Sequence, residues 1–327
     1  MRKVLVTGAS GFVGGHVVHA LRARGIAVRC LVRRTSSLEF IKPLDPELVF
    51  GDVTDPATLL PAIAGVDAVV HCAGLTKAPS RCRYFHVNEE GCRNLFAACR
   101  TRKGQIGRIV HISSLAALGP SPDGRPVTED ASPHPVSDYG ESKLAAQRIA
   151  QSHMDELPVS IVVPPAIYGP RDVDFCVYFK WVRRGLVPLI GTGSRRLSLI
   201  YVKDLAEAVA MVLGSDRASG RTYLVDDGCI QTWTSLANTI GSAMARTPRQ
   251  MHLPVALAIA MGIIGDVRSR LTGKAWVVNS QKIREFLQTS WTCSSQRIRA
   301  ELGFCPQYPL ERGIQETFSW YRENNWL

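Results

Sequence analysis

Short apolar runs alternate with longer amphipathic stretches along the first half of the chain. Segments such as 14–25 (GGHVVHALRARG) and 56–65 (PATLLPAIAG) have the spacing of helices. Six runs around them predict strands: KVLVTG (3–8), AVRCLV (27–32), ELVFGDVTD (47–55), DAVVHCAG (67–74), GRIVHISS (107–114) and PVSIVVPPAIYG (158–169). Strands buried on both faces are apolar throughout, and helices between them form right-handed crossovers. The pattern therefore predicts an α/β fold with a doubly wound parallel sheet.

The alternation weakens from about residue 170, where helical patterns dominate and Trp, Pro and Arg become more frequent. We expect residues 1–170 to form the doubly wound domain and residues 171–327 to form a smaller, mainly helical domain. Segments at about 197–228 are expected to return to the first domain. Because no Ser/Gly-rich linker separates the halves, we expect them to pack together around a cleft.

The most apolar stretch is LPVALAIAMGIIG at 253–265, which is followed by Arg268, Arg270 and Lys274. It is too short to span a bilayer, which takes about 20 apolar residues. The simpler interpretation is a helix buried in the C-terminal domain. The alternative is a helix, apolar on every side, that contacts an apolar substrate or a membrane surface beside its basic flank.

Composition and charge narrow the class of protein. The chain has 327 residues, and 46% of them are hydrophobic, which is enough for a globular core. The net charge of +11 comes from scattered basic residues without a recognition motif, so we expect no nucleic acid; an acidic small ligand or an anionic membrane surface explains the excess equally well. The N-terminus lacks the pattern of a signal peptide, which predicts a cytoplasmic protein, with membrane association as the alternative. The nine cysteines include no C-x-x-C pair, which predicts reduced thiols and no metal site.

Three glycines follow the first predicted strand. Gly8, Gly11 and Gly14 are spaced three residues apart, where the strand ends and a helix begins. This context lets the backbone turn tightly and approach a pyrophosphate at the helix N-terminus, where unpaired N–H groups favour an anion. The predicted dinucleotide site comprises Gly8, Ser10, Gly11, Phe12, Val13 and Gly14. The alternative is a plain glycine turn.

The end of the second strand predicts which dinucleotide binds. NAD sites have an acid there that binds the ribose hydroxyls, whereas NADP sites have an arginine that accommodates the additional phosphate. Val32 stands roughly where the acid would be, and Arg33 and Arg34 follow it. Two guanidiniums can bind a 2′-phosphate through charge-assisted hydrogen bonds. We therefore expect NADP(H), with NAD(H) as the alternative if these arginines are only solvated.

Several further motifs occur in a fixed order. They are TGASGFVG (7–14), GDVTD (51–55), HCAG (71–74), HVNEEG (86–91), ISSLAALG (112–119), YGESK (139–143) and PPAIYGP (164–170). Together they resemble the extended short-chain dehydrogenases/reductases, a superfamily that includes NAD-dependent epimerases and dehydratases. The endings YVKDLAEAV (201–209) and ELGFCPQYPLERGIQETFSWY (301–321) resemble this family more weakly. The resemblance implies a dinucleotide-binding Rossmann domain followed by a substrate domain.

The resemblance also implies catalytic roles. Tyr139 would be the acid/base, Lys143 its partner and the holder of the nicotinamide ribose, and Ser114 the group that polarises the substrate oxygen, with Ser113 as the neighbouring alternative. Residues four apart share one helix face, as this tyrosine and lysine do. A phenol has a pKa of about 10, and lowering it to about 7 takes roughly 4 kcal/mol. The lysine and the positive nicotinamide can together supply that field.

Other positions match the family's cofactor contacts. Asp52 and Val53 would lie near the adenine, Ala73 and Gly74 against the dinucleotide, and Pro165 and Ile167 beside the nicotinamide. Asn88 would fix the central helix near the site, and a purely structural role for it is an equal alternative. Each of these residues also has an ordinary packing explanation.

Three departures separate the chain from the family's sugar-nucleotide enzymes. Ala166 stands where epimerases typically have asparagine, and Leu197 where they have an arginine for the diphosphate, although Arg195 and Arg196 are adjacent and could substitute. The residues after Ser114 are apolar, whereas dehydratases have an Asp-Glu pair there. What remains resembles the 3β-hydroxysteroid dehydrogenase and dihydroflavonol reductase branch.

The resulting hypothesis is an NADP(H)-dependent oxidoreductase that interconverts a secondary alcohol and a ketone on a small hydrophobic, steroid-like or polycyclic substrate. Two alternatives stay open: a nucleotide-sugar epimerase with tightly bound NAD, and a non-catalytic NADP(H) sensor. The resemblance further implies a homodimer that pairs through helices at about 84–100 and 139–153.

Overall fold

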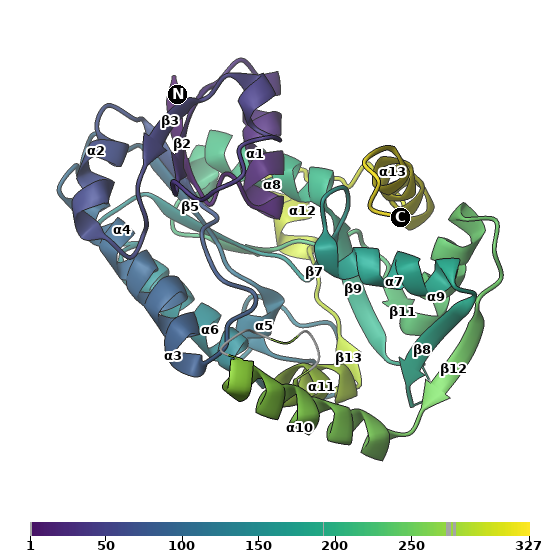
Figure 1. Ribbon diagram of the computed structural model, residues 1–327. Coiled ribbons are helices and arrows are strands. Elements are labelled where there is room, and N and C mark those ends of the chain that lie inside the picture. Colours follow the sequence, from purple (N-terminus) through teal and green to yellow (C-terminus); the bar gives the residue numbers. More distant parts are fainter. Residues whose placement is uncertain (1, 192, 273–275, 277–278) are drawn as a thin grey trace.

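The computed structural model describes residues 2–191, 193–272, 276 and 279–327. A seven-stranded sheet forms the centre of the first half, with the strand order β10-β6-β5-β4-β1-β2-β3 and every neighbouring pair parallel (Figure 1). Its strands are β1 (Lys3–Thr7), β2 (Ala27–Val32), β3 (Glu47–Phe50), β4 (Ala68–His71), β5 (Arg108–Ile112), β6 (Val159–Val163) and β10 (Thr222–Leu224). All but β10 lie within the predicted runs, and the predicted fold class is confirmed.

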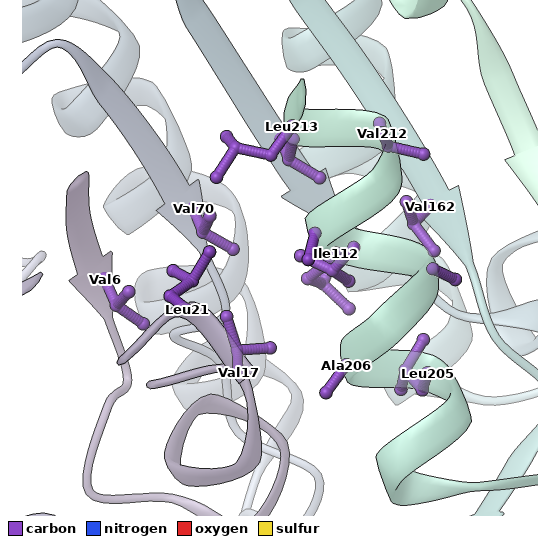
Figure 2. Close-up of a cluster of buried hydrophobic side chains, with 14 of the residues drawn as sticks. Val6, Val17, Leu21, Val70, Ile112, Val162, Leu205, Ala206, Val212 and Leu213 are labelled. Atoms are coloured by element: carbon purple, nitrogen blue, oxygen red, sulfur yellow. The ribbon is translucent and has the colours of Figure 1, made fainter. Parts of the chain in front are cut away.

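Helices cover both faces of this sheet. Five of these helices, four from the first half and one from the second, are α1 (Phe12–Ala23), α2 (Leu59–Ile63), α4 (Gly91–Arg100), α6 (Asp138–Ser152) and α8 (Val202–Gly214). Alternate side chains of a strand point to opposite faces, so Val4 and Val6 of β1 pack with α1 and α8, whereas Leu5 packs with α2, α4 and α6. Figure 2 shows the first of these cores, with Leu21 of α1 and Leu205 of α8 among its side chains. Each such fully buried side chain contributes about 1.5–3 kcal/mol.

Short elements complete the connections within this half. They are η1 (Lys42–Leu44), η2 (Pro56–Thr58), α3 (Arg81–Phe85), the π-helical turn η3 (His86–Glu90) and α5 (Leu115–Leu118). In the second half η4 (Asp216–Ala218) precedes β10. Within 197–228, α8 packs on α1, and β10 extends the main sheet beside β6.

The second half is mainly helical, but it also contains short strands. The helices are α7 (Val173–Arg183), α9 (Trp233–Ala243), α10 (Val255–Thr272), α11 (Ser280–Leu287), α12 (Gln296–Leu302) and α13 (Leu310–Glu323). One small sheet comprises β7 (Ala166–Tyr168), β9 (Arg196–Tyr201), β11 (Ile230–Thr232) and β13 (Ser290–Trp291), and β8 (Leu186–Ile190) pairs with β12 (Arg249–Leu253). Apart from β7, which lies within the predicted run 158–169, the sequence did not predict these strands, because they are short and one of them, LVPLI, contains a proline.

The apolar segment 253–265 ends β12 and begins α10, and the expectation of a buried helix there is wrong. Large side chains such as Ile263 and Ile264 are 54% and 67% exposed, whereas Ala258 is 1% exposed. Gly262 faces α11, where an added Cβ would lie 3.1 Å from the Ser280 Cα. The helix therefore packs through its small residues and turns its large ones outward. No helix in the described part of the chain is long and apolar enough to cross a membrane.

Candidate active site

The carboxyl ends of β1 and β4 meet where the strand order reverses. From β1 the chain proceeds to β2 and β3 on one side and then returns to β4 on the other. Open α/β sheets bind ligands in the crevice at such a switch point. Here the turn at Gly8 lies against the backbone at Ala73, which follows β4. The topology thus brings two of the predicted cofactor segments together.

Two glycines of the first loop are required by packing within the chain. Gly8 has φ +67°, and an added Cβ would lie 2.7 Å from the Ala73 nitrogen. A Cβ at Gly14 would collide with the carbonyl oxygen of Gly8, because helix and strand approach closely there. Any larger residue at either position would push the loop and the first turn of α1 apart.

Gly11 is different, because a Cβ there would meet the Gly8 carbonyl oxygen at 3.1 Å and nothing else within 4 Å. It is the N-cap of α1, a helix of 12 residues with no capping side chain and no acid in its first turn. The free N–H groups of such a turn attract an anion. The residues present therefore fit the pyrophosphate of a dinucleotide, with the loop backbone from Gly8 to Gly14 as its cradle.

Arg33 and Arg34 lie just beyond β2, and both side chains are exposed. The turn is closed by a hydrogen bond from the Ser36 nitrogen to the Arg33 carbonyl, at 3.0 Å. The Arg34 guanidinium lies over the ring of Phe50, 5.3 Å from its centroid. Both charges are therefore available to a phosphate at this end of the crevice.

Asp52 and Val53 follow β3 and shape the neighbouring turn. An Asp52 carboxylate oxygen accepts hydrogen bonds from the Thr54 nitrogen and hydroxyl, each at 2.9 Å. Val53 is 5% exposed, and a Cβ at Gly91 would lie 2.7 Å from its Cγ2. Both predicted adenine contacts thus have packing roles in this turn as well.

Arg171 belongs to this site, although the sequence reasoning missed it. Its guanidinium donates to the carbonyl oxygens of Ser10 and Gly11, both at 3.3 Å, and lies over Phe40 at 4.1 Å from the ring centroid. Its backbone has φ +75°, which is rare for a residue with a side chain. Its position directly after PPAIYGP was the available signal. It places a positive charge on the glycine loop.

Ser114 and Tyr139 come together from the starts of two helices. Ser114 is the N-cap of α5, and Tyr139 lies in the first turn of α6, where the Ser114 hydroxyl is close enough to lower its pKa. Ser113 instead donates to the Gln147 side chain at 2.5 Å. Burial raises the pKa of Tyr139 to about 12. The motif predicts that Lys143 and the nicotinamide together lower the pKa of Tyr139. Among the protein's own groups burial has the largest effect, so this pKa is raised instead.

Lys143 lies one turn further along α6 and is 6% exposed. Its Nζ donates to the Ile112 carbonyl oxygen at 2.7 Å, and a Cβ at Gly74 would lie 3.9 Å from it. Burial lowers the pKa of Lys143 to about 8. The ammonium is therefore held between the ends of β4 and β5, close to the predicted dinucleotide segment.

Asn88 connects β4 to the catalytic helix. It lies in the π-helical turn η3 and is 2% exposed. Its amide oxygen accepts from the Leu75 nitrogen at 2.7 Å, and its amide nitrogen donates to the Leu75 oxygen at 3.1 Å and the Ser142 hydroxyl at 2.9 Å. Because Leu75 and Ser142 already use both the amide oxygen and the amide nitrogen of Asn88, the geometry favours a positioning role for this residue.

Pro165 and Ile167 lie at the other side of the crevice, at the junction between β6 and β7. Pro165 is buried, Ile167 is half-buried and Ala166 between them is exposed. The junction is tied to α5 by a hydrogen bond from the Leu115 nitrogen to the Pro164 oxygen, at 2.8 Å. An apolar wall thus stands beside the Ser114 helix start.

Arg195 and Arg196, the candidate diphosphate clamp, bind backbone carbonyls. Arg195 donates to the Leu287 oxygen at 3.3 Å and to the Ile190 oxygen, and Arg196 donates to the Gly124 oxygen. These contacts hold loops around β9. Both guanidiniums thus have structural partners within the chain.

Helix α11 contacts the start of α6, which the sequence did not predict. The Ser137 hydroxyl donates to Glu285 at 2.6 Å, and the Asp138 nitrogen donates to Gln281 at 2.7 Å. The Glu285 carboxylate also raises the pKa of Tyr139, after burial. A segment far along the chain therefore holds the start of α6 and affects the pKa of Tyr139, the candidate acid/base.

Two buried histidines lie close enough to Lys143 to be affected by its charge. His71 and His111 are neighbours on β4 and β5, and their ligand atoms and that of Cys92 lie within 4.8 Å of one another. His71 shares a hydrogen bond of 2.7 Å with the Thr7 hydroxyl, while both His111 ring nitrogens lack a partner among the described residues. Burial first, and then the charge of Lys143, lowers the pKa of His71 to about 3 and that of His111 well below its usual range. Both rings are therefore neutral.

Comparisons with known proteins show the family of the chain. The profile of the NAD dependent epimerase/dehydratase family matches residues 4–225. Ceramide reductase of Caulobacter vibrioides (strain NA1000 / CB15N) is 33% identical over 99% of this chain and 96% of its own length. Sterol demethylase protein B of Methylococcus capsulatus is 35% identical over 99% of each chain. The crystal structure of gox2253 covers 100% of both chains with a TM-score of 0.83 and 27% identity.

Proposed function

Since the chain belongs to the NAD dependent epimerase/dehydratase family, we propose that it is an NADP(H)-dependent oxidoreductase that interconverts a secondary alcohol and a ketone on a hydrophobic substrate. Membership confirms the resemblance and makes the chain an NAD(P)-dependent enzyme of the extended short-chain type. The observation that carries the proposal is that Ser114 and Tyr139 approach each other at two helix starts, with the buried Lys143 one helical turn beyond Tyr139. The choice of NADP(H) over NAD(H) and the hydrophobic class of the substrate are the more specific parts of this proposal.

The protein groups can supply each proton and charge that ketone reduction needs. Tyr139 is protonated at neutral pH, so its hydroxyl can donate a proton to the substrate oxygen. Ser114 can donate a hydrogen bond to the same oxygen while charge develops on it. When bound, the nicotinamide supplies or accepts the hydride. Lys143 keeps a positive charge beside the tyrosine and favours the phenolate that the proton transfer leaves.

A lipid-like substrate fits the surroundings better than a sugar nucleotide. The residues that follow Ser114, from Leu115 to Leu118, are apolar. Arg195 and Arg196 are occupied by backbone carbonyls. The relatives named above are a ceramide reductase and a sterol demethylase protein, and both names refer to lipids. We therefore propose a ketone or alcohol on a sterol or a long-chain lipid.

The first experiment is turnover with a panel of ketones. NADPH oxidation would be followed with a 3-ketosteroid, a 3-ketosphinganine derivative and a 2-alkyl-3-oxoalkanoate, and conversion of UDP-galactose to UDP-glucose would be measured separately, because epimerisation consumes no NADPH. We expect turnover with at least one lipid ketone and none with the sugar nucleotide. Tightly held NAD together with conversion of UDP-galactose would instead establish an epimerase.

Tyr139→Phe separates an enzyme from a sensor. The variant should lose about 100-fold or more in kcat, because it cannot donate the proton, while its affinity for NADPH stays unchanged. Tyr84→Phe is the matched control, since the two rings are 6.0 Å apart and the Tyr84 hydroxyl donates to the Thr76 oxygen at 3.4 Å. Unchanged turnover in Tyr139→Phe would exclude the assigned acid/base.

Cofactor choice is tested by the double variant Arg33→Ala/Arg34→Ala. Loss of two charge-assisted contacts to the 2′-phosphate should weaken NADPH about tenfold or more and leave NADH unchanged. The control is Arg183→Ala/Arg184→Ala, another exposed adjacent pair, in which Arg184 lies 5.6 Å from the Trp181 ring centroid. Equal loss for both dinucleotides would contradict the NADP assignment.

A further inference from the structure

We propose that the outer face of α10 is a docking surface for an anionic lipid bilayer. The inference rests on the proposed function only for the lipid nature of the substrate. It concerns how that substrate reaches the site, and the surface itself is defined by α10 residues that take no part in the chemistry.

The exposed side chains of α10 are large and apolar. Leu271 is 82% exposed and Ile264 67%, and the other members of this face are Val255, Leu257, Ile259, Met261, Ile263 and Val267. The inner contacts are made by Ala258, which is 1% exposed, and Gly262. A helix that only had to cover a protein core would show the opposite arrangement. The outward position of the large side chains indicates that the outer face of α10 contacts another apolar environment.

The helix is suited to lie in the plane of an interface. It has 18 residues, which makes it about 27 Å long at 1.5 Å per residue. Trp276 is 42% exposed, and Arg268 lies over its ring at 4.1 Å from the centroid. Tryptophan and arginine together are typical of the boundary between acyl chains and headgroups.

Charge decides between a bilayer and a second copy of the chain. From Val255 to Leu287 the sequence has five Lys or Arg and two acids. Both acids are engaged, Asp266 by the Ser280 nitrogen at 3.3 Å and Glu285 by Ser137 and Lys282. With five basic and two acidic residues the segment carries a net charge of +3, so it would repel a copy of itself and attract anionic headgroups, at about 1 kcal/mol for each basic residue near the surface.

The surface lies next to the candidate active site. α10 packs on α11, and α11 holds Ser137 and Asp138 directly before the catalytic tyrosine. Figure 1 shows α10 as the outermost helix along the lower edge, on the side of α5 and α6. The homodimer implied by the family would use 84–100 and 139–153 and so leave α10 free. A docked molecule would thus present the crevice to lipids in the bilayer.

The test is cosedimentation of the full chain with vesicles of phosphatidylcholine alone or mixed with phosphatidylglycerol. We expect binding to the mixed vesicles that weakens with salt and falls about tenfold or more in Ile264→Glu/Leu271→Glu. The control is Leu60→Glu/Ile230→Glu, two side chains that are 47% and 46% exposed elsewhere, and it should bind as the parent does.

Turnover of a short, water-soluble ketone keeps this test separate from the proposed function. It should be equal in all variants, whereas turnover of vesicle-borne substrate should fall in Ile264→Glu/Leu271→Glu alone. Absence of vesicle binding by the parent chain, or equal binding by both double variants, would overturn the docking surface. A change from dimer to monomer in Ile264→Glu/Leu271→Glu without vesicle binding would assign the face to a second copy instead.

Discussion

Lys143 sets the pH range of the site because its charge is buried. Its pKa is lowered to about 8, so the cation is present below that pH and is lost as the pH rises through it. Tyr139, with a pKa of about 12, stays protonated over the same range. The lysine, and not the tyrosine, should therefore limit ketone reduction on the alkaline side.

We expect kcat/KM for reduction to be flat below about pH 7 and to fall tenfold per pH unit well above the Lys143 pKa of about 8. An arginine keeps its charge at these pH values, so Lys143→Arg should retain part of the activity without this alkaline fall. Steady-state rates across pH measure both. An unchanged fall in Lys143→Arg would assign it to another group.

Gly14 and Gly11 of the first loop have different roles, and alanine substitutions can distinguish the packing role from the binding role. Gly14→Ala should destabilise the protein by several kcal/mol, because its Cβ would collide with the Gly8 carbonyl. Gly11→Ala meets that oxygen at 3.1 Å and should change the unfolding midpoint little, but it should weaken dinucleotide binding about tenfold or more, since the Cβ stands at the helix start. Thermal unfolding and fluorescence titration give the two readouts. Equal destabilisation would refute the distinction.

Local spacing explains which site residues the sequence could predict. Ser114, Tyr139 and Lys143 are brought together by two helix starts and one helical turn, so their positions follow from the motif. Arg171 and Glu285 were missed because their partners lie 161 and 148 positions away, and such contacts leave no periodic mark in the sequence. Glu285 is found only once the chain is folded, whereas Arg171 had one signal in the sequence, its position directly after PPAIYGP.

The contact between the helices α11 and α6 links the C-terminal half of the chain to Tyr139, the proposed acid/base. The Glu285 carboxylate accepts from Ser137 at 2.6 Å and raises the pKa of Tyr139. An amide at this position still accepts the hydrogen bond but carries no charge. Glu285→Gln therefore isolates the electrostatic effect from the structural one.

In Glu285→Gln the pKa of Tyr139 should fall, since the repulsion that disfavours the phenolate is removed. More phenolate is then present at a given pH, and alcohol oxidation, which needs Tyr139 as base, should be faster by about threefold at pH 8, equivalent to about half a pKa unit. Glu323→Gln at the exposed end of α13 is the control. A slower oxidation in Glu285→Gln would mean that the contact acts by position alone.

Hydropathy predicted α10 as an element but not its surroundings. A continuous apolar run is compatible with a helix buried in the protein or with a helix that faces an apolar environment outside it. Only what contacts the helix distinguishes the two cases. The small residues Ala258 and Gly262 mark the face of α10 that packs on the protein. The short strands β8 and β12 escaped prediction for a related reason, since each is completed by the other from a distant segment.

For the whole molecule, the buried histidines predict a loss of stability in acid. The pKa of His111 is lowered well below 6.5 by burial, so below that pH the unfolded chain binds a proton that the folded chain does not. His111→Leu removes this linkage at similar volume. Relative to the variant, the parent chain should lose up to about 2 kcal/mol between pH 6.5 and pH 5.

Urea unfolding of both proteins measures this difference. Above pH 7.5 it should be constant, because the ring is neutral in both states there. Buried carboxyls with a raised pKa, such as Asp172 at about 7, act with the opposite sign in the parent and in the variant alike, so they cancel in the difference. A difference that does not depend on pH would show that His111 is protonated in the folded state.

The return of α8 and β10 to the first sheet has a consequence for how this chain can evolve or be engineered. α8 covers the face that α1 shares, and β10 covers the edge of β6, yet both come after α7, β8 and β9 in the chain. A fragment ending near residue 170 would expose that face and that edge. The two halves of the chain therefore cannot be exchanged as independent domains. New specificity would have to arise by substitution and loop insertion within an interwoven scaffold, and a chimera would need at least two crossover points to keep the sheet whole.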